Sequence, residues 1–530
     1  MISPAVLSDV FRGDDGIDKI ALFSVPVSVL SVVALNTAFH RPWIAQALLL
    51  PFYLLAGIDL YLLHTYEARL SSSTLSLMLE NAHHLSDFAQ TQMLPLLLAT
   101  ALPVGFCGLV LFKTSKLRNP TRRPVWLAVA GLVLIYGSLI AWRTRETGSL
   151  VDGVEEVVFH DRSSPFGVLP QGYLAWRVYV DAQAHQDRAA RFSFGAMRTI
   201  TPEEPEVYVL VIGESSRPDR WGLYGYPGPT TPRLSREPRL LLFRDMLTQA
   251  ALTQESVPLM ITRNRIEAPD ERSGEKSILS AYKEAGFKTY WLSTQQRDQF
   301  TGAINRYSGE ADQSRFFERR HDGILVDAMK KALEVSEPRS RLFFVLHTQG
   351  SHFVFRDRYP AARAPFTPTG SDHERMLAEY DNSIAYTDEV LSQVIGLLKA
   401  RPGISALLYV ADHGENLNDD DRELFGHFFN NEYDLPIPAF LWYSEAYAQA
   451  FPEKIEAAKA NASRPLNTRV VFSTLADMGS LKLRDMDVSA LSVMSRRLSP
   501  PPRLFSKNGR ITDYDEWRAR VPTPARGVAP

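Results

Sequence analysis

Four apolar runs dominate the first part of this 530-residue chain. Each is about 20 residues long, the length that a helix needs to cross the hydrocarbon core of a bilayer. The runs are Ile20–Phe39, Trp43–Leu63, Met93–Phe112 and Val125–Trp142. A buried helix of a soluble protein can reach this length, but four such runs so close together predict membrane spans. A cleaved signal peptide does not fit, because the first run is long and is followed by three more.

Basic residues predict the orientation of these spans. The loop between the third and fourth runs is rich in lysine and arginine, which marks it as cytoplasmic. Its basic residues are Lys113, Lys116, Arg118, Arg122 and Arg123. The N-terminus, the Thr65–Gln92 loop and everything after Arg143 are then expected outside the cytoplasm. The Thr65–Gln92 loop is predicted to be an amphipathic helix, whose Glu80, His83 and His84 either bind a lipid head group or form a solvated face.

Composition limits the chemistry of the outer part. The formal net charge of −2 argues against a nucleic-acid partner, which normally meets a basic face. The single cysteine, Cys107, lies in the third apolar run. The outer part therefore contains no disulfide and no cysteine ligand for a metal.

From Glu206 the sequence alternates between strand and helix patterns. Predicted strands include Val207–Ile212, Lys288–Ser293, Leu342–Leu346 and Ala406–Ala411, and predicted helices include Ser277–Ala285, Arg375–Leu398 and Asn467–Met478. This rhythm predicts an α/β domain with a largely parallel central sheet covered by helices. The expected organisation is a transmembrane helical domain at 1–145, an interfacial linker with a bridging helix at 146–205, a catalytic domain at 206–498 and a C-terminal tail at 499–530.

Two of the predicted strands end in residues that bind metals. Glu214 follows the first strand, and the adjacent Asp412 and His413 follow the strand Ala406–Ala411. Ligands in open α/β sheets bind at the carboxyl ends of strands, so these distant segments are expected to form one site. Carboxylate and imidazole donors suit zinc, and three protein ligands with an open position are typical of a catalytic zinc.

The stretch 248–263 is the candidate source of a nucleophile. Thr253 is expected to open a helix, whose N-terminus favours an anion such as phosphate. Thr253 or Ser256 could alternatively act only as an N-cap of that helix. His352 and His427 are either anion contacts, with His352 also a candidate general acid, or histidines of the core and loops.

Four segments together resemble the phosphoethanolamine transferases, which are membrane-anchored members of the alkaline phosphatase superfamily. The segments are Tyr208–Leu234, Thr253–Pro258, His347–His352 and Asp412–Glu415. The resemblance implies that Glu214, Asp412 and His413 bind zinc and that Thr253 is the zinc-bound nucleophile. It also implies that His352 and His427 contact the donor phosphate or the acceptor. Members of this family often carry five spans and several disulfides, whereas four spans and no outer cysteine are predicted here.

The implied activity is zinc-dependent transfer of phosphoethanolamine from phosphatidylethanolamine to an envelope acceptor. The acceptor would be lipid A, lipopolysaccharide core or a periplasmic glucan, with the catalytic domain on the periplasmic side of a bacterial inner membrane. A phosphoglycerol transferase or phosphodiesterase with the same site is an alternative, and so is an inactive membrane sensor or scaffold. The segment Ser216–Arg220 matches the sulfatase motif that yields formylglycine, but it follows Glu214 too closely to supply the nucleophile.

Overall fold

A computed structural model describes residues 19–66, 85–118, 123–147 and 188–521, with gaps at 270, 273, 296–302, 318–319, 428 and 508–509, and a few residues between 148 and 187. The chain divides into two compact units, Met1–Ala184 and His185–Pro530. Each unit is described by itself below. Most of the predicted bridging helix, and Glu80, His83 and His84 in the Thr65–Gln92 loop, lie outside the described residues.

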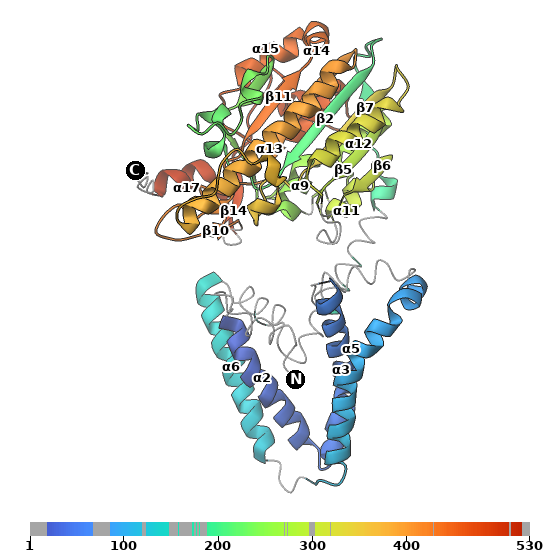
Figure 1. Cartoon of the computed structure of the whole chain (residues 1–530), viewed down its shortest axis with the longest axis vertical. Coiled ribbons are helices and arrows are strands. Elements are labelled where there is room, and N and C mark those ends of the chain that lie inside the picture. The colour runs from blue at the N-terminus through green and yellow to red at the C-terminus, as the bar shows by residue number, and fades with distance from the viewer. Residues whose placement is uncertain are drawn as a thin grey trace. The chain divides into compact units, whose positions relative to one another are not determined.

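The described residues of the first unit form four long helices, which Figure 1 shows. They are α2 (Lys19–Ala38), α3 (Pro42–Tyr66), α5 (Leu85–Thr114) and α6 (Arg123–Thr147). Among the described residues, three stretches are long and apolar enough to cross a membrane: Pro42–Tyr61, Met93–Thr114 and Val125–Arg145. In α2 the described apolar stretch is shorter, Val29–Ala38. Three of the four predicted spans thus meet the length requirement, and the first remains a prediction.

The second unit is built on a seven-stranded sheet of order β3-β11-β8-β2-β7-β5-β6. Its strands are β2 (Glu206–Gly213), β3 (Leu240–Phe243), β5 (Lys288–Ser293), β6 (Gln313–Phe316), β7 (Arg341–His347), β8 (Ile404–Ala411) and β11 (Ala439–Tyr443). The five strands from β8 to β6 run parallel, but β11 is antiparallel to both of its neighbours. The sheet is therefore mixed. The residues described between β8 and β11 contain no helix, and without a crossover helix a neighbouring strand returns antiparallel.

The helices cover both faces of this sheet. They are α9 (Thr253–Ile261), α10 (Ile278–Glu284), α11 (Ala303–Ser308), α12 (Gly323–Glu334), α13 (Asp372–Ala400), α14 (Glu445–Ala450), α15 (Pro452–Asn461), α16 (Val470–Met478) and α17 (Tyr514–Arg520). Figure 1 shows α12 and α13 lying across one face. The helices predicted at 277–285, 375–398 and 467–478 correspond to α10, α13 and α16.

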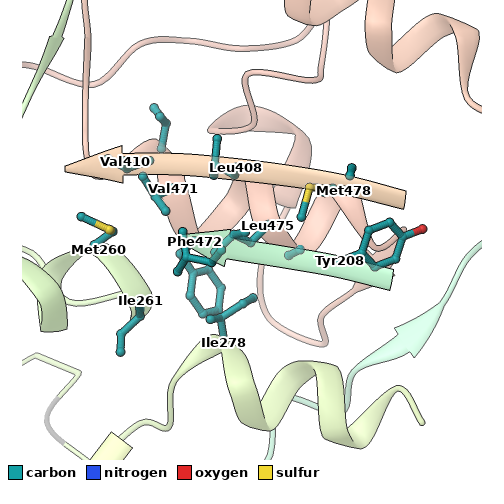
Figure 2. Packing of buried hydrophobic residues seen from close by; sticks show 14 of the residues in the cluster. Tyr208, Met260, Ile261, Ile278, Leu408, Val410, Val471, Phe472, Leu475 and Met478 are labelled. Atoms are coloured by element: carbon teal, nitrogen blue, oxygen red, sulfur yellow. The ribbon is translucent and has the colours of Figure 1, made fainter. Parts of the chain in front are cut away.

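Strand β2 lies at the centre of the core. Its side chains alternate between the two faces, as the period of a strand requires. Val207, Val209 and Val211 pack with α12 and α13, whereas Tyr208 and its alternate neighbours pack with α9, α10 and α16. Figure 2 shows the residues packed on the Tyr208 face of the sheet, with Tyr208 beside residues of α16. Burial of both faces explains why the strand is apolar at every position but its first and Tyr208.

Short strand pairs tie the remaining segments to this core. They are β1 (Met197–Arg198) with β13 (Leu481–Lys482), β4 (Met246–Leu247) with β12 (Leu466–Asn467), β9 (Asn416–Leu417) with β10 (Phe425–Gly426), and β14 (Leu504–Lys507) with β15 (Arg510–Asp513). The C-terminal hairpin β14–β15 packs through Phe505 against Leu247 and Leu435. The segment after 499 is thus folded onto the second unit as far as it is described.

Candidate active site

The carboxyl ends of four neighbouring parallel strands converge on one site. Glu214 directly follows β2, Asp412 and His413 follow β8, Gln295 follows β5, and the loop 348–352 follows β7. Because β8, β2, β7 and β5 are adjacent and parallel, these residues meet at the same edge of the sheet. The structure therefore brings together Glu214 and the Asp412–His413 pair, which are about two hundred residues apart in sequence.

Glu214, Asp412 and His413 surround a small buried space. Their ligand atoms all lie within 4.8 Å of one another. The Nε2 atom of His413 is 3.5 Å from Oε1 of Glu214 and 3.4 Å from Oδ2 of Asp412. All three side chains are buried. The structure thus brings together the three side chains that the sequence analysis names as candidate zinc ligands.

The hydroxyl of Thr253 completes this group. Its Oγ1 donates a hydrogen bond of 3.1 Å to Oε2 of Glu214 and lies 3.2 Å from Nε2 of His413. Thr253 is the first residue of α9, and Leu252, which makes no side-chain hydrogen bond there, occupies the N-cap position. The N-cap alternative therefore does not hold for Thr253. Ser256 is buried on the same helix, and its Oγ makes no hydrogen bond to the described residues.

The donor atoms and their bonding suit a bound zinc ion. Asp412 uses Oδ1 to accept hydrogen bonds from the backbone N–H groups of Ser215 and His413, at 3.1 and 2.7 Å. Its Oδ2 is buried and has no hydrogen-bond partner among the described residues. Burial and the nearby charge of Asp412 raise the pKa of Glu214 well above its ordinary value. A divalent cation would stabilise these two adjacent buried carboxylates, and it would give the Oδ2 atom of Asp412 a partner.

Two residues that the sequence analysis did not assign, Gln295 and Asp322, hold this group and the loop beside it in place. Gln295 donates through Nε2 to Oε2 of Glu214 at 2.7 Å and to the carbonyl of Thr348 at 2.9 Å. Asp322 accepts the backbone N–H groups of Gln349 and Gly350, at 2.8 and 2.9 Å. The sequence itself could have pointed to Gln295, because this residue lies two positions beyond the predicted strand Lys288–Ser293, at the carboxyl end where ligands bind.

The histidines form a second cluster beside the first. His413, Glu415 and His427 also place one ligand atom each within 4.8 Å of one another. The ring of His427 lies 4.3 Å from that of His413 and 5.8 Å from that of His352, measured between centroids. The structure thus brings both predicted histidines to the site. Glu415, which the sequence analysis left without a role, is 3.0 Å from Nδ1 of His427.

The pKa values of His352 and His427 are shifted in opposite directions. Burial, together with the positive charges of His427 and Arg358, lowers the pKa of His352 to about 3. Burial also disfavours charge on His427, but the hydrogen bond and charge of Glu415 outweigh it and raise the pKa of His427 above its ordinary value. At neutral pH His352 is therefore neutral. His427 is the better proton donor of the pair.

A family model for sulfatases matches residues 206–478. The chain belongs to the sulfatase family. Among curated proteins it is similar to the putative transferase YhbX of Escherichia coli K12, at 33% identity over 45% of this chain and 43% of that protein. It is also similar to the phosphoethanolamine transferase EptC of the same strain, at 27% identity over 59% of this chain and 58% of that protein. The predicted resemblance to phosphoethanolamine transferases is thereby confirmed.

Solved structures show the same fold. The C-terminal periplasmic domain of E. coli EptC matches with a TM-score of 0.55 and 26% identity, over 60% of this chain and 95% of that domain. The integral membrane protein EptA of Neisseria meningitidis matches with a TM-score of 0.56 and 19% identity, over 94% of each chain. The sequence alignments to YhbX and EptC span less than two thirds of those proteins.

Proposed function

We propose that this protein transfers phosphoethanolamine from phosphatidylethanolamine to a glycolipid or glucan of the bacterial envelope. The observation that carries the proposal is the hydroxyl of Thr253, which touches both Glu214 and His413 at the N-terminus of a helix. A hydroxyl in this position is a nucleophile beside candidate metal ligands. Relatives named phosphoethanolamine transferases support the choice of the transferred group.

The proposed zinc ligands are Glu214, Thr253, Asp412 and His413. When bound, zinc would lower the pKa of a coordinated hydroxyl toward neutrality and act as a Lewis acid on phosphate oxygens. The periplasmic domain of E. coli EptC, which this chain resembles, has also been solved in complex with zinc. Gln295 and the two backbone N–H groups on Asp412 would fix the carboxylates in the required orientation.

In the first half-reaction Thr253 attacks the phosphorus of the donor. The bond from Oγ1 to phosphorus forms as the bond from phosphorus to the diacylglycerol oxygen breaks. The departing oxygen takes a proton, and His427 is the proposed donor because Glu415 raises its pKa. The neutral His352 is proposed to bind the phosphate by hydrogen bonding. The N-terminal amides of α9 favour the same anion.

In the second half-reaction a hydroxyl or phosphate oxygen of the acceptor attacks the phosphothreonine. The bond from the acceptor oxygen to phosphorus forms as the bond from phosphorus to Oγ1 breaks. Oγ1 then takes up a proton from solvent, which replaces the proton that it released to solvent on attack, and the transfer is complete. The proposed setting is the periplasmic side of the inner membrane, where the donor lipid and the acceptor both occur. Neighbours of known structure include a periplasmic domain and an integral membrane protein, which supports this setting.

The test is to incubate the purified chain with phosphatidylethanolamine without acceptor and to measure the mass of its peptides. We expect a phosphoethanolamine adduct on Thr253 and none in Thr253→Ala. A phosphoglycerol adduct with phosphatidylglycerol instead would assign the alternative head group. An adduct on Ser256 or Ser216 would overturn the assignment of the nucleophile. No adduct with either lipid would favour an inactive sensor or scaffold.

A further inference from the structure

A cavity lies at the far end of the helix that begins with Thr253. Its volume is about 150 Å³, far more than the roughly 10–15 Å³ that one water molecule needs. The loop after α9 forms one wall and α16 forms another, and the lining includes four arginines: Arg263, Arg265, Arg272 and Arg469. No step proposed above uses this cavity.

The arginines outnumber the carboxylates that neutralise them. Glu275 accepts two bonds of 2.7 Å from Arg263 and one of 3.0 Å from Arg272. Glu267 pairs with Arg469 at 3.0 Å and, together with Glu271, with Arg265. Four guanidinium groups thus share three glutamates in this described group. Each guanidinium carries five N–H donors, so these pairs leave donors for an additional anion.

Three polar atoms in the lining residues are buried without a hydrogen-bond partner among the described residues. They are the hydroxyl of Ser473, Nε of Arg265 and Oδ1 of Asn264. Ser473 is fully buried, at 0% exposed. A buried polar atom without a partner is costly, so each of these three atoms would gain from a hydrogen-bond partner that the described residues do not supply. The hydroxyl and Nε are donors that suit an anion, whereas Oδ1 is an acceptor that suits a hydroxyl group.

Beside these polar residues and Thr262, the lining contains apolar side chains. Phe472, Met486 and Leu491 contribute to the wall. Figure 2 shows Phe472 of α16 in the core with Ile261 of α9 and Ile278 of α10, so this wall belongs to the packed interior. A sugar ring has both apolar faces and hydroxyl groups, and therefore matches a cavity that combines the partly exposed Met486 and Leu491 with polar side chains. A free phosphate would use only the arginines.

We propose that this cavity binds a phosphate-bearing saccharide and is an acceptor-recognition subsite of the enzyme. The role as an acceptor subsite rests on the proposed function. The nine residues of α9 separate the cavity from the nucleophile, a distance of roughly 13 Å along the helix. An acceptor held here by its phosphate could present a more distant oxygen to Thr253.

Binding tests the cavity independently of activity. Glucose 6-phosphate, inorganic phosphate and glucose are titrated calorimetrically into the full chain and into Asp412→Ala, which lacks one proposed zinc ligand. We expect glucose 6-phosphate to bind several-fold more tightly than inorganic phosphate in both proteins, and glucose not to bind. Equal affinity for the two phosphates would overturn the saccharide assignment. Loss of binding in Asp412→Ala would place the ligand at the other site.

Variants then link the cavity to turnover. The double variant Arg265→Gln/Arg272→Gln leaves Glu275 paired with Arg263 and Glu267 paired with Arg469, and Ser473→Ala removes a hydroxyl that holds no other contact. We expect each to raise the KM for a phosphorylated acceptor, by about tenfold or more for the double variant, without slowing adduct formation on Thr253.

The exposed Arg236→Gln, outside the cavity, is the control. An unchanged KM with normal adduct formation overturns the cavity proposal alone, whereas no adduct in the wild type overturns the proposed function.

Discussion

At the scale of single residues, the candidate metal ligands are held in place by hydrogen bonds from neighbouring side chains. Glu214 is buried beside another carboxylate, and it would be unstable there without partners. Ser215 donates to its Oε1 at 2.8 Å, while Thr253 and Gln295 donate to its Oε2. Both carboxylate oxygens are therefore oriented before any metal binds.

Gln295 offers a direct test of this orienting role. We predict that Gln295→Leu lowers zinc affinity by about 10- to 100-fold, because Glu214 loses the partner that fixes its position. The exposed Gln393→Leu on α13 is the matched control and should bind zinc normally. Zinc affinity is measured by competition with a chromogenic chelator. An unaltered affinity in Gln295→Leu would show that Glu214 is oriented without it.

His347 predicts how stability depends on pH. Burial lowers its pKa to about 4, below the ordinary 6.5, so on acidification the unfolded chain takes up a proton first. Its contribution to the free energy of unfolding is therefore complete above pH 6.5 and decreases as the pH falls toward 4, by at most about 1.4 kcal/mol per pH unit.

Thermal unfolding of the full chain between pH 4 and pH 7, followed by tryptophan fluorescence, tests this dependence. In His347→Leu the decrease in stability over this range should be smaller than in the wild type. The exposed His373→Leu should keep the wild-type dependence. The same pH profile in His347→Leu as in the wild type would contradict the prediction.

At the scale of elements, the loop after β7 packs directly on the end of β2. Gly350 has φ of +46°, and a Cβ there would lie 2.8 Å from the carbonyl oxygen of Glu214 and 2.9 Å from its nitrogen. Both atoms belong to the backbone, so they cannot move aside as a flexible side chain would. Glycine at this position lets the two strand ends approach closely enough to form one site.

We predict that Gly350→Ala weakens zinc binding and lowers stability by about 1 kcal/mol or more, because it displaces Glu214 and strains a left-handed backbone. The matched control is Gly396→Ala in α13, where a Cβ meets nothing within 4 Å. Helix propensity should make that variant more stable by about 0.5–1 kcal/mol. The comparison uses melting temperature and zinc affinity. Equal zinc affinity in Gly350→Ala and wild type would mean that the loop can shift without moving Glu214.

At the scale of the whole molecule, the open question is whether the first helix crosses the membrane. Helix α2 runs over Lys19–Ala38 and its sequence is apolar from Ile20 onward, but only the stretch Val29–Ala38 is described closely enough to be assessed as a span. With the loop 113–123 in the cytoplasm, four spans place the N-terminus on the same side as the catalytic unit. Three spans place it on the opposite side.

A single introduced cysteine decides between these topologies. In a Cys107→Ala background, we predict that Ser8→Cys reacts with a membrane-impermeant thiol reagent added outside the inner membrane, as four spans require. A reporter enzyme that is active only in the periplasm should be active when it is fused after Ser499. If the cysteine reacts with the reagent only after the membrane is permeabilised, the N-terminus lies in the cytoplasm and only three helices cross the membrane. An inactive fusion would contradict the periplasmic setting.

The sequence by itself determined the features that depend on local pattern. Apolar length predicted the helices of the first unit, and runs of apolar residues predicted β2, β5, β7 and β8. Because metal-type ligands directly followed two of these strands, Glu214, Asp412 and His413 could be proposed as one group. The start of α9 at Thr253 was also visible, as a polar residue before an apolar helix.

Only the tertiary structure decided which segments became neighbours. The order β8-β2-β7-β5 brings Gln295 to Glu214 and the loop at Gly350 onto β2, and it depends on how all the helices pack on both faces. The antiparallel β11 and the arginine cavity between the α9 loop and α16 likewise have no local signature. A side chain's type and its place on an element are local properties, but its partners come from segments far along the chain, and the packing of the whole core selects them.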